Sequence, residues 1–237
     1  MSSPRPQLAP AAPIAQPVEI ASVRDGVFFT LPDALPRGRH NLTRDQIQSA
    51  QTERLLAATT ELLAAFGHRG FGAGDIAKRA GVSLAAFYDC FENKDACIFA
   101  GYDRFIQVLL TRVTAVDTTQ PNRAALVRAV LATYLDAMQS DPVVARAYQV
   151  EIDALGPPAR ARRRNSLELF AAFLQRLIAD RTPGKQPPPE LSWSAYIGVV
   201  YATRQLVSDL LDESEQPDLL ALGDDLQIWI SDLFRER

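Results

Sequence analysis

Residues 75–96, DIAKRAGVSLAAFYDCFENKDA, have the pattern of two short helices joined by a tight turn. Gly81 suits the turn because glycine adopts backbone conformations that other residues avoid. Ser83 follows, where a hydroxyl oxygen can cap the start of the second helix. The residues expected to pack the two helices together are small or apolar: Ile76, Ala77, Ala80, Val82, Phe87 and Phe91. The stretch therefore predicts a helix-turn-helix, with an ordinary helical hairpin as the alternative.

The second helix of such a motif enters the major groove of duplex DNA with its amino end. Tyr88 is turned away from the packing face and can donate its phenol proton to a phosphate, and Lys94 can reach phosphate from the next helix. The groove-facing positions are apolar: Leu84, Ala85 and Ala86. Because such side chains cannot form the paired hydrogen bonds that read guanine or adenine, we expect discrimination to come from thymine methyl groups and DNA shape.

The whole chain has 237 residues, of which 47% are hydrophobic and 22% charged, enough for one or two domains with a core. Prolines cluster in residues 1–17 and 183–189, and the stretches between are rich in Ala and Leu with few turn signals. This pattern predicts an all-α fold of about nine helices. The expected helices cover residues 42–66, 73–80, 84–91, 93–116, 121–139, 141–155, 157–181, 190–212 and 215–235.

No pattern of residues indicates catalysis, a metal site or a bound cofactor, so an enzyme is not expected. His40 and His68 have no metal-ligand spacing, and the two cysteines, Cys90 and Cys97, are expected to be buried and inert. The chain has no secretory signal and no apolar run of about 18 residues, which predicts a soluble cytoplasmic protein without a membrane span. The net charge of −3 does not by itself indicate a nucleic-acid partner.

Two segments nevertheless concentrate positive charge. Residues 37–44 contain three arginines and a histidine without any acid. We hypothesise that Arg37 and Arg39 form a flexible arm that enters the minor groove, and an exposed solubilising segment is the alternative. The run RARRR at 160–164 is either a solvated helix face or a site for an anionic effector.

The helix-turn-helix and its surroundings resemble the DNA-binding domain of the TetR family of bacterial transcriptional regulators. The resemblance covers about residues 36–105. Within it, LPRGRH at 35–40 followed by RLLAA at 54–58 is similar to an actinobacterial-type subgroup with a basic amino-terminal arm. The remaining helices fit the family in length and layout only.

The resemblance implies that Ser83, Tyr88 and Lys94 contact phosphate in this chain. The sequence departs from the family at Gly72, where Thr or Ser is common, so a capping hydroxyl and a phosphate contact are missing. It also departs at Cys90, where Tyr or His is common. The apolar groove-facing positions are a third departure, because many members carry Lys, Arg or Thr there.

Residues 1–35 lack a helical period and are broken by prolines, which predicts a disordered or extended Pro-rich tail. The resemblance further implies two segments after it: a helix-turn-helix domain with a basic arm (36–93) and a helical effector-binding and dimerisation domain (94–237). A mostly apolar pocket for a small, largely apolar effector is implied in the last of these segments. Its candidate lining residues are Tyr102, Phe105, Tyr134, Met138, Tyr148, Phe170 and Phe173. An ordinary hydrophobic core is the alternative for each of them.

The last two expected helices carry wide apolar stripes and small residues that permit close helix approach. In the family such helices pair with their symmetry mates, which implies an isologous homodimer and an inverted-repeat operator. The expected interface residues are Trp193, Ile197, Tyr201, Leu226, Trp229 and Ile230. A monomer that buries both stripes internally is the alternative.

Together these expectations describe a DNA-binding transcriptional regulator, a repressor that a small-molecule effector releases from its operator. The alternative is a helical interaction protein that has the same fold and has lost sequence-specific DNA binding. Only the apolar groove-facing positions and Gly72 favour that alternative.

Overall fold

The protein is all-helical in the part that the computed structural model describes, which comprises residues 19–32, 43–179, 191–214 and 216–233. These residues contain nine α-helices and one 3-10 helix, which confirms the predicted fold class. None of these helices combines the length and apolar character needed to cross a lipid bilayer.

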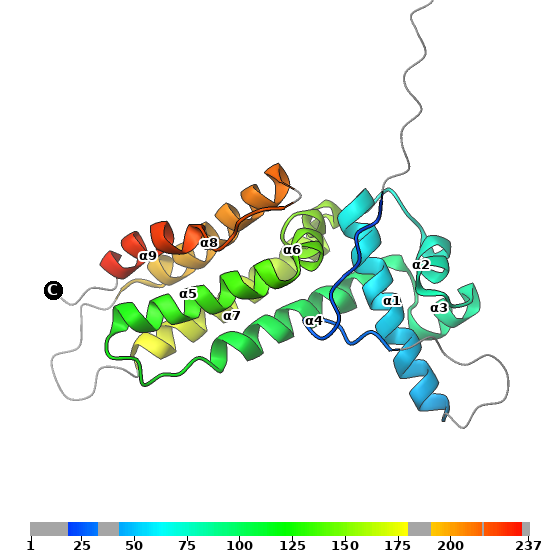
Figure 1. Ribbon diagram of the computed structural model, residues 1–237, viewed down its shortest axis with the longest axis horizontal. Coiled ribbons are helices and arrows are strands. Elements are labelled where there is room, and N and C mark those ends of the chain that lie inside the picture. The colour runs from blue at the N-terminus through cyan, green and yellow to red at the C-terminus, as the bar shows by residue number, and fades with distance from the viewer. Residues whose placement is uncertain (1–18, 33–42, 180–190, 215, 234–237) are drawn as a thin grey trace, which may run out of the picture.

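The first three helices lie together at one end of an elongated molecule (Figure 1). They are α1 (Arg44–Phe66), α2 (Ala73–Ala80) and α3 (Leu84–Cys90). The longer α4 (Lys94–Thr114) leaves this group and runs into the body of the protein. α4 therefore connects the predicted helix-turn-helix covalently to the other helices.

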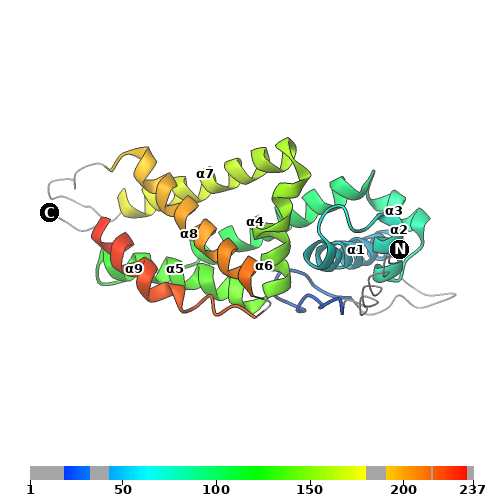
Figure 2. The ribbon, with the colours of Figure 1, turned by 90° about the horizontal axis from the view of Figure 1, so that it is seen from above.

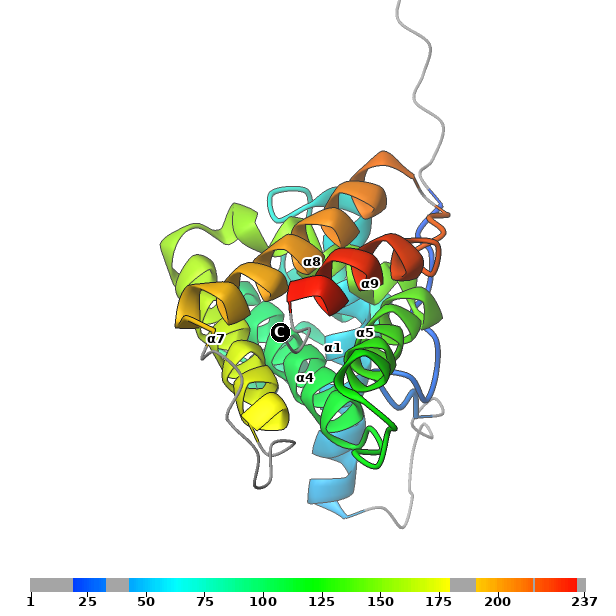
Figure 3. The same ribbon diagram turned by 90° about the vertical axis from the view of Figure 1, so that its left-hand side faces the viewer.

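The rest of the body packs around α4. Its helices are α5 (Arg123–Ser140), α6 (Pro142–Gln149), the 3-10 helix η1 (Glu151–Leu155), α7 (Pro157–Ala179), α8 (Trp193–Glu213) and α9 (Leu222–Leu233). Seen end-on, α4 lies between α5 and α7, and α8 and α9 cross above them (Figure 3). α6 lies beside α1, so the body touches the amino-terminal group through a second helix as well (Figure 2).

Several helices begin at a side chain that accepts a backbone N–H of the first turn, which satisfies a donor that the helix itself cannot pair. The residues that do so are Thr43, Ser83, Asn93, Asn122 and Asp141. Gly72 is the residue before the first turn of α2, and the Asp75 carboxylate accepts the Gly72 N–H at 2.9 Å. Local sequence therefore fixes these helix starts.

The expected helix over residues 141–155 is wrong in its second half. The α-helix ends at Gln149, because the Gln149 carbonyl accepts hydrogen bonds from Arg204 and Ser208 of α8. The chain continues as η1 and then turns at Gly156, which has a φ of 83°. A long-range contact thus replaces the helical hydrogen bond that the sequence pattern predicted.

The last helix is also shorter than the expected 215–235. α9 begins at Leu222, and Pro217 and Leu219 are buried in the non-helical segment before it. The Leu219 N–H donates to the Gln139 side chain of α5 at 2.7 Å. The expected helix start near residue 215 is therefore wrong, because Pro217 lies in this non-helical segment.

The amino-terminal strap, residues 19–32, is non-helical and packs against the helices, so the disordered alternative does not hold for this part of the expected tail. Val23, Phe28 and Phe29 of the strap are buried. The Phe28 ring lies 5.4 Å from the ring of Phe105 in α4. Burying two phenylalanine rings contributes several kcal/mol to the free energy of folding, about 1.5–3 kcal/mol for each.

The strap also forms hydrogen bonds to both parts of the molecule. The Val23 N–H donates to Glu61 of α1 at 3.0 Å, and the Arg24 N–H donates to Asp141, the cap of α6, at 2.7 Å. Arg79 of α2 is paired with the same Glu61 at 2.6 Å and donates to Ser22 at 3.0 Å. The strap therefore lies across the junction between the amino-terminal group and the body.

Candidate nucleic-acid interface and internal pocket

The turn between α2 and α3 has the geometry that the sequence predicts. Gly81 has φ 67° and ψ 34°, the left-handed conformation that glycine adopts without strain. The Arg54 guanidinium of α1 donates to the Ala80 carbonyl at 2.7 Å, at the end of α2. A Cβ on Gly81 would lie 2.8 Å from that guanidinium. Sequence reasoning missed Arg54, because its partner lies 26 residues along the chain.

α3 presents one buried and one exposed face. Phe87 is fully buried, whereas Tyr88 is 56% exposed and Leu84 is 47% exposed, as predicted. Ser83 accepts the Ala86 N–H at 3.1 Å. Ala86 is buried, so its assignment to the groove-facing surface is wrong; it shares the inward face with Phe87. The exposed residues on this face of the helix are Leu84, Ala85, Tyr88 and Asp89.

Lys94 is engaged within the protein. Its ammonium donates to the carbonyls of His68 and Phe71 at 2.6 and 3.0 Å and lies 4.9 Å from the centre of the Phe71 ring. These contacts hold the connection between α1 and α2 against the start of α4. A phosphate contact by Lys94 stays a prediction.

The charge around α3 is sparse among the described residues. α3 has no basic side chain, and Arg79 is paired with Glu61. Arg69 and Lys78 are exposed near it in sequence. Arg37 and Arg39, the expected minor-groove arm, lie outside the described residues.

The body contains an apolar pocket of about 850 Å³ of atom-free space, part of it open to solvent. α4, α5, α6, α7, α8 and α9 all contribute to its lining. Six residues of the sequence-predicted set line it: Tyr102, Phe105, Tyr134, Tyr148, Phe170 and Phe173. Met138, the seventh, is fully buried in the core and is not part of the lining.

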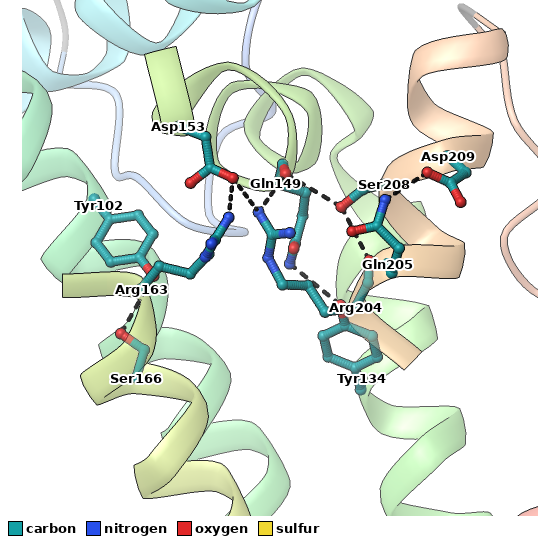
Figure 4. Close-up of polar contacts among 10 residues, drawn as sticks. All are labelled: Tyr102, Tyr134, Gln149, Asp153, Arg163, Ser166, Arg204, Gln205, Ser208 and Asp209. Carbon is teal, nitrogen blue, oxygen red and sulfur yellow. Dashed lines mark hydrogen bonds and ion pairs between the residues drawn. The ribbon is translucent and has the colours of Figure 1, made fainter. Parts of the chain in front are cut away.

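One end of this pocket is polar. Tyr134, Gln149 and Arg204 line it, and Asp153 of η1 and Arg163 of α7 lie beside Arg204 (Figure 4). Arg204 is 8% exposed and lies 3.7 Å from Asp153, which also forms a close ion pair with Arg163. Gln149 donates to the Tyr134 hydroxyl at 3.2 Å. Sequence reasoning identified Tyr134, and it named Arg163 only as part of the basic run at 160–164, a possible site for an anionic effector. The other residues are brought together by tertiary packing.

Burial sets the protonation of this polar end. It raises the pKa of Tyr134 and, near it, of Tyr102, whose hydroxyl donates to Ser166 at 3.2 Å. Both phenols are therefore neutral hydrogen-bonding groups at physiological pH. Burial also lowers the pKa of the Arg204 guanidinium, which nevertheless stays protonated.

A buried hydrogen bond connects the pocket to α1, the helix against which α2 packs. Tyr148 of α6 lines the pocket, and its hydroxyl lies 2.8 Å from the Thr60 hydroxyl of α1. Gly101 of α4 gives this phenol room, since a Cβ there would lie 2.0 Å from it. Helices α1, α4 and α6 therefore meet at one tyrosine that a pocket ligand would touch.

The outer surface of α8 and α9 carries several exposed aromatic and aliphatic side chains. Trp193, Tyr201 and Trp229 of the predicted interface set are 39–44% exposed, and Ile197 is partly exposed. Leu226 and Ile230 are buried within the protomer, so their assignment to an interface is wrong; they lie on the inner face of α9. Ile228, 66% exposed, was missed.

His68 and the two cysteines, among the described residues, have different surroundings. No cluster of three potential ligands occurs in the part of the chain that the structure describes. His68 is paired with Asp95 at 2.7 Å. Cys97 is fully buried beside Thr59, and burial raises the pKa of its thiol to about 12. Cys90 is only partly buried, so the expected buried pair holds for Cys97 alone.

Known proteins share the amino-terminal helices of this architecture. Residues 55–100, from the middle of α1 to the first part of α4, match the family model described as "Bacterial regulatory proteins, tetR family". The match spans the complete helix-turn-helix. These residues are a TetR-type DNA-binding domain. Regulators with this domain bind DNA.

Other known proteins are similar to the body of this chain as well. The HTH-type transcriptional regulator EthR of Mycobacterium tuberculosis is 23% identical over 215 residues, covering 86% of this chain and 95% of EthR. The fatty acid degradation regulator FadR of Bacillus halodurans shares the fold, with a TM-score of 0.63 at 18% identity over 79% of this chain and 97% of that structure. FadR of Bacillus subtilis, solved in complex with stearoyl-CoA, gives a TM-score of 0.61 at 17% identity. The similarity covers 74% of this chain and 95% of that structure.

Proposed function

We propose that this protein is a TetR-family repressor that binds an inverted-repeat operator as a homodimer and leaves it when a largely apolar effector fills the pocket. The observation that carries the proposal is the position of Tyr148, which lines the pocket and contacts Thr60 of α1. A ligand that moves Tyr148 moves the support of the helix-turn-helix. For a nearly complete switch, the effector must prefer the non-binding conformation by about 10⁴-fold.

In the proposed complex the amino end of α3 enters the major groove. Ser83 uses an oxygen lone pair for its cap, so its proton is available to a phosphate, and the exposed Tyr88 hydroxyl can donate to another. Leu84 and Ala85 then contact base edges without hydrogen bonds. Operator choice consequently depends on thymine methyl groups and DNA shape.

Arg37 and Arg39 are proposed to supply the positive charge that α3 lacks, as a minor-groove arm. The replacement of both by alanine tests this proposal while leaving the strap intact. We expect weaker DNA binding and a salt dependence whose slope falls by about one unit for each lost phosphate contact. An unchanged affinity and slope would contradict the arm.

The proposed dimer pairs α8 and α9 with the same helices of a second copy. Trp193, Ile197, Tyr201, Ile228 and Trp229 supply the apolar surface for it, and burying aromatic side chains is typical of stable interfaces. Two recognition helices would then face one side of the duplex, one helical turn apart or a multiple of it. Sedimentation of the protein as a monomer at micromolar concentration would overturn the dimer.

An apolar ligand is supported by the lining of the pocket and by the stearoyl-CoA complex of the B. subtilis relative, whose long acyl chain has the same chemistry. The second candidate function is that of a helical interaction protein without sequence-specific DNA binding. The acidic Asp89 on the exposed face of α3 and the internal contacts of Lys94 favour that candidate.

Selection of bound sequences from random duplex DNA separates the two functions. Enrichment of a palindromic consensus supports the repressor, and Tyr88→Ala should weaken binding to the selected duplex about 10-fold, the loss of one charge-assisted hydrogen bond. The absence of any enriched sequence would favour the interaction protein.

A further inference from the structure

The polar end of the pocket contains a buried group that lacks a partner. Gln149 is 5% exposed, and its Oε1 accepts no hydrogen bond from any described residue. Its Nε2 donates to Tyr134. A half-turn of the amide exchanges the two ends: the Tyr134 hydroxyl then donates to Oε1, and Nε2 is left without an acceptor. In either orientation one buried amide atom of this pocket-lining residue is unpaired, a cost that a bound ligand can remove.

The same end of the pocket also has unequal charge. Two guanidinium groups, of Arg163 and Arg204, share the single carboxylate of Asp153. Among the described residues, neither guanidinium forms an ion pair with another acid, so the second guanidinium is left unbalanced. Arg204 satisfies part of its donor capacity at the Gln149 carbonyl, at 2.6 Å. One positive charge is therefore in excess beside an apolar cavity, and buried charge is stabilised by an opposite charge.

We propose that this end of the pocket binds the carboxylate of an apolar monocarboxylic acid, with Arg204 as the residue that determines head-group specificity. The inference rests on the proposed effector pocket and names the class of ligand that it takes. The hydrocarbon part of the ligand lies along α4, α5 and α7, where Phe105, Leu131 and Phe170 line the cavity. Its carboxylate accepts from Arg204 and from the Gln149 amide after the half-turn.

A carboxylate fits this site better than neutral heads of the same size. An alcohol or an ester offers no negative charge to the unbalanced guanidinium. A primary amide can pair with Gln149, but it too leaves the excess charge uncompensated. A charged partner strengthens a hydrogen bond about twofold over a neutral one, which gives the acid the largest gain.

Calorimetric titration of the full-length protein with decanoate, decanamide, decan-1-ol and methyl decanoate tests the assignment, because the four probes share one chain length and differ in the head. We expect decanoate to bind about 10- to 100-fold more tightly than the neutral three. Equal affinity for decanoate and decan-1-ol would overturn the head-group assignment while leaving an apolar pocket. Failure of all four to bind would overturn the inference together with the pocket.

Charge variants sharpen the test. Arg204→Met should lower the affinity for decanoate about 10- to 100-fold and change that for decan-1-ol less than about threefold. Arg163→Met, which leaves Arg204 in place and cancels the excess charge, should weaken only decanoate. Asp153→Asn removes the only negative charge of this group and so doubles the excess of positive charge. It should strengthen decanoate binding. The proposal would be overturned if Arg204→Met lost affinity for decanoate and decan-1-ol to the same extent. Weaker decanoate binding by Asp153→Asn would overturn it as well.

Arg160→Met is the matched control, because Arg160 lies on the same helix as Arg163, is exposed and does not line the pocket. It removes the same net charge from the protein and should leave decanoate affinity unchanged. Circular dichroism and thermal unfolding of each variant show whether the fold is intact. DNA binding by each variant is measured separately, so that a failed repressor assignment is distinguished from a failed head-group assignment.

Discussion

The helix-turn-helix and the polar end of the pocket are built in opposite ways. The turn at Gly81, the cap at Ser83 and the packing of Phe87 all lie within residues 75–96. The polar end collects side chains from positions 134 to 204, on five different elements. A locally encoded unit can be identified from its spacing, whereas a site assembled by tertiary packing becomes visible only in the structure.

The largest expected effect concerns the local unit. Phe87→Ala removes a fully buried ring and should lower the free energy of unfolding by about 3–5 kcal/mol. Tyr88→Ala, at the adjacent exposed position, should change it by less than about 0.5 kcal/mol while weakening DNA binding. Urea unfolding of the two variants measures the contrast, and similar losses in both would contradict the assignment of the two faces.

A smaller effect is expected at the turn itself. Gly81→Ala forces a side chain into the left-handed conformation and places its Cβ against Arg54, which should cost about 1–2 kcal/mol. Gly74→Ala is the control, because its Cβ would meet nothing within 4 Å and α2 should become slightly more stable. Thermal unfolding compares them, and equal stability of both variants would show that the turn tolerates a side chain.

The hydrogen bond between Tyr148 of the pocket and Thr60 of α1 should contribute still less to the free energy of unfolding. Tyr148→Phe and Thr60→Val each remove one end of a buried hydrogen bond of 2.8 Å. A double-mutant cycle should give a coupling of about 0.5–1.5 kcal/mol in unfolding free energy. The same cycle, run on the effector-induced change in DNA affinity, should show coupling between the residues. Strict additivity in both measurements would indicate that the two regions communicate elsewhere.

The smallest perturbation is chemical labelling of the two cysteines. With a thiol pKa of about 12, Cys97 has almost no thiolate at pH 8 and is fully buried, whereas Cys90 of α3 is partly exposed. We expect iodoacetamide to modify Cys90 at least about 100-fold faster, and Cys97 only after urea is added. Mass spectrometry of tryptic peptides distinguishes the sites. Comparable rates in the native protein would mean that the start of α4 opens readily.

The sequence predicted the fold class, the turn and most aromatic residues of the pocket, because periodicity and turn chemistry are local properties. It placed Ala86, Leu226 and Ile230 on the wrong faces of their helices. The residue pattern of a short helix, or of one with a wide apolar stripe, does not closely determine how the helix is rotated about its own axis. Met138 was assigned to the pocket by its chemistry alone. In each case the orientation depends on neighbouring helices that the spacing of residues does not specify.

The contacts of the strap and of Arg204 could not be predicted from the sequence, for a different reason. Val23 bonds a residue 38 positions away and Arg24 one 117 positions away. Arg204 meets the Gln149 carbonyl across 55 positions. Charged residues in a sequence show no pairing at such separations, and a proline-rich beginning resembles a tail whether or not its continuation is buried.

The strap gives the molecule two adjacent amides with different anchors. The Val23 N–H is bonded to α1, and the next one, of Arg24, is bonded to the cap of α6. If an effector rotates the body against the amino-terminal group, at least one of these neighbouring bonds must lengthen. Hydrogen–deuterium exchange at the two positions would then differ between the free and the ligand-bound protein, so a single dipeptide reports on which side of the junction moves.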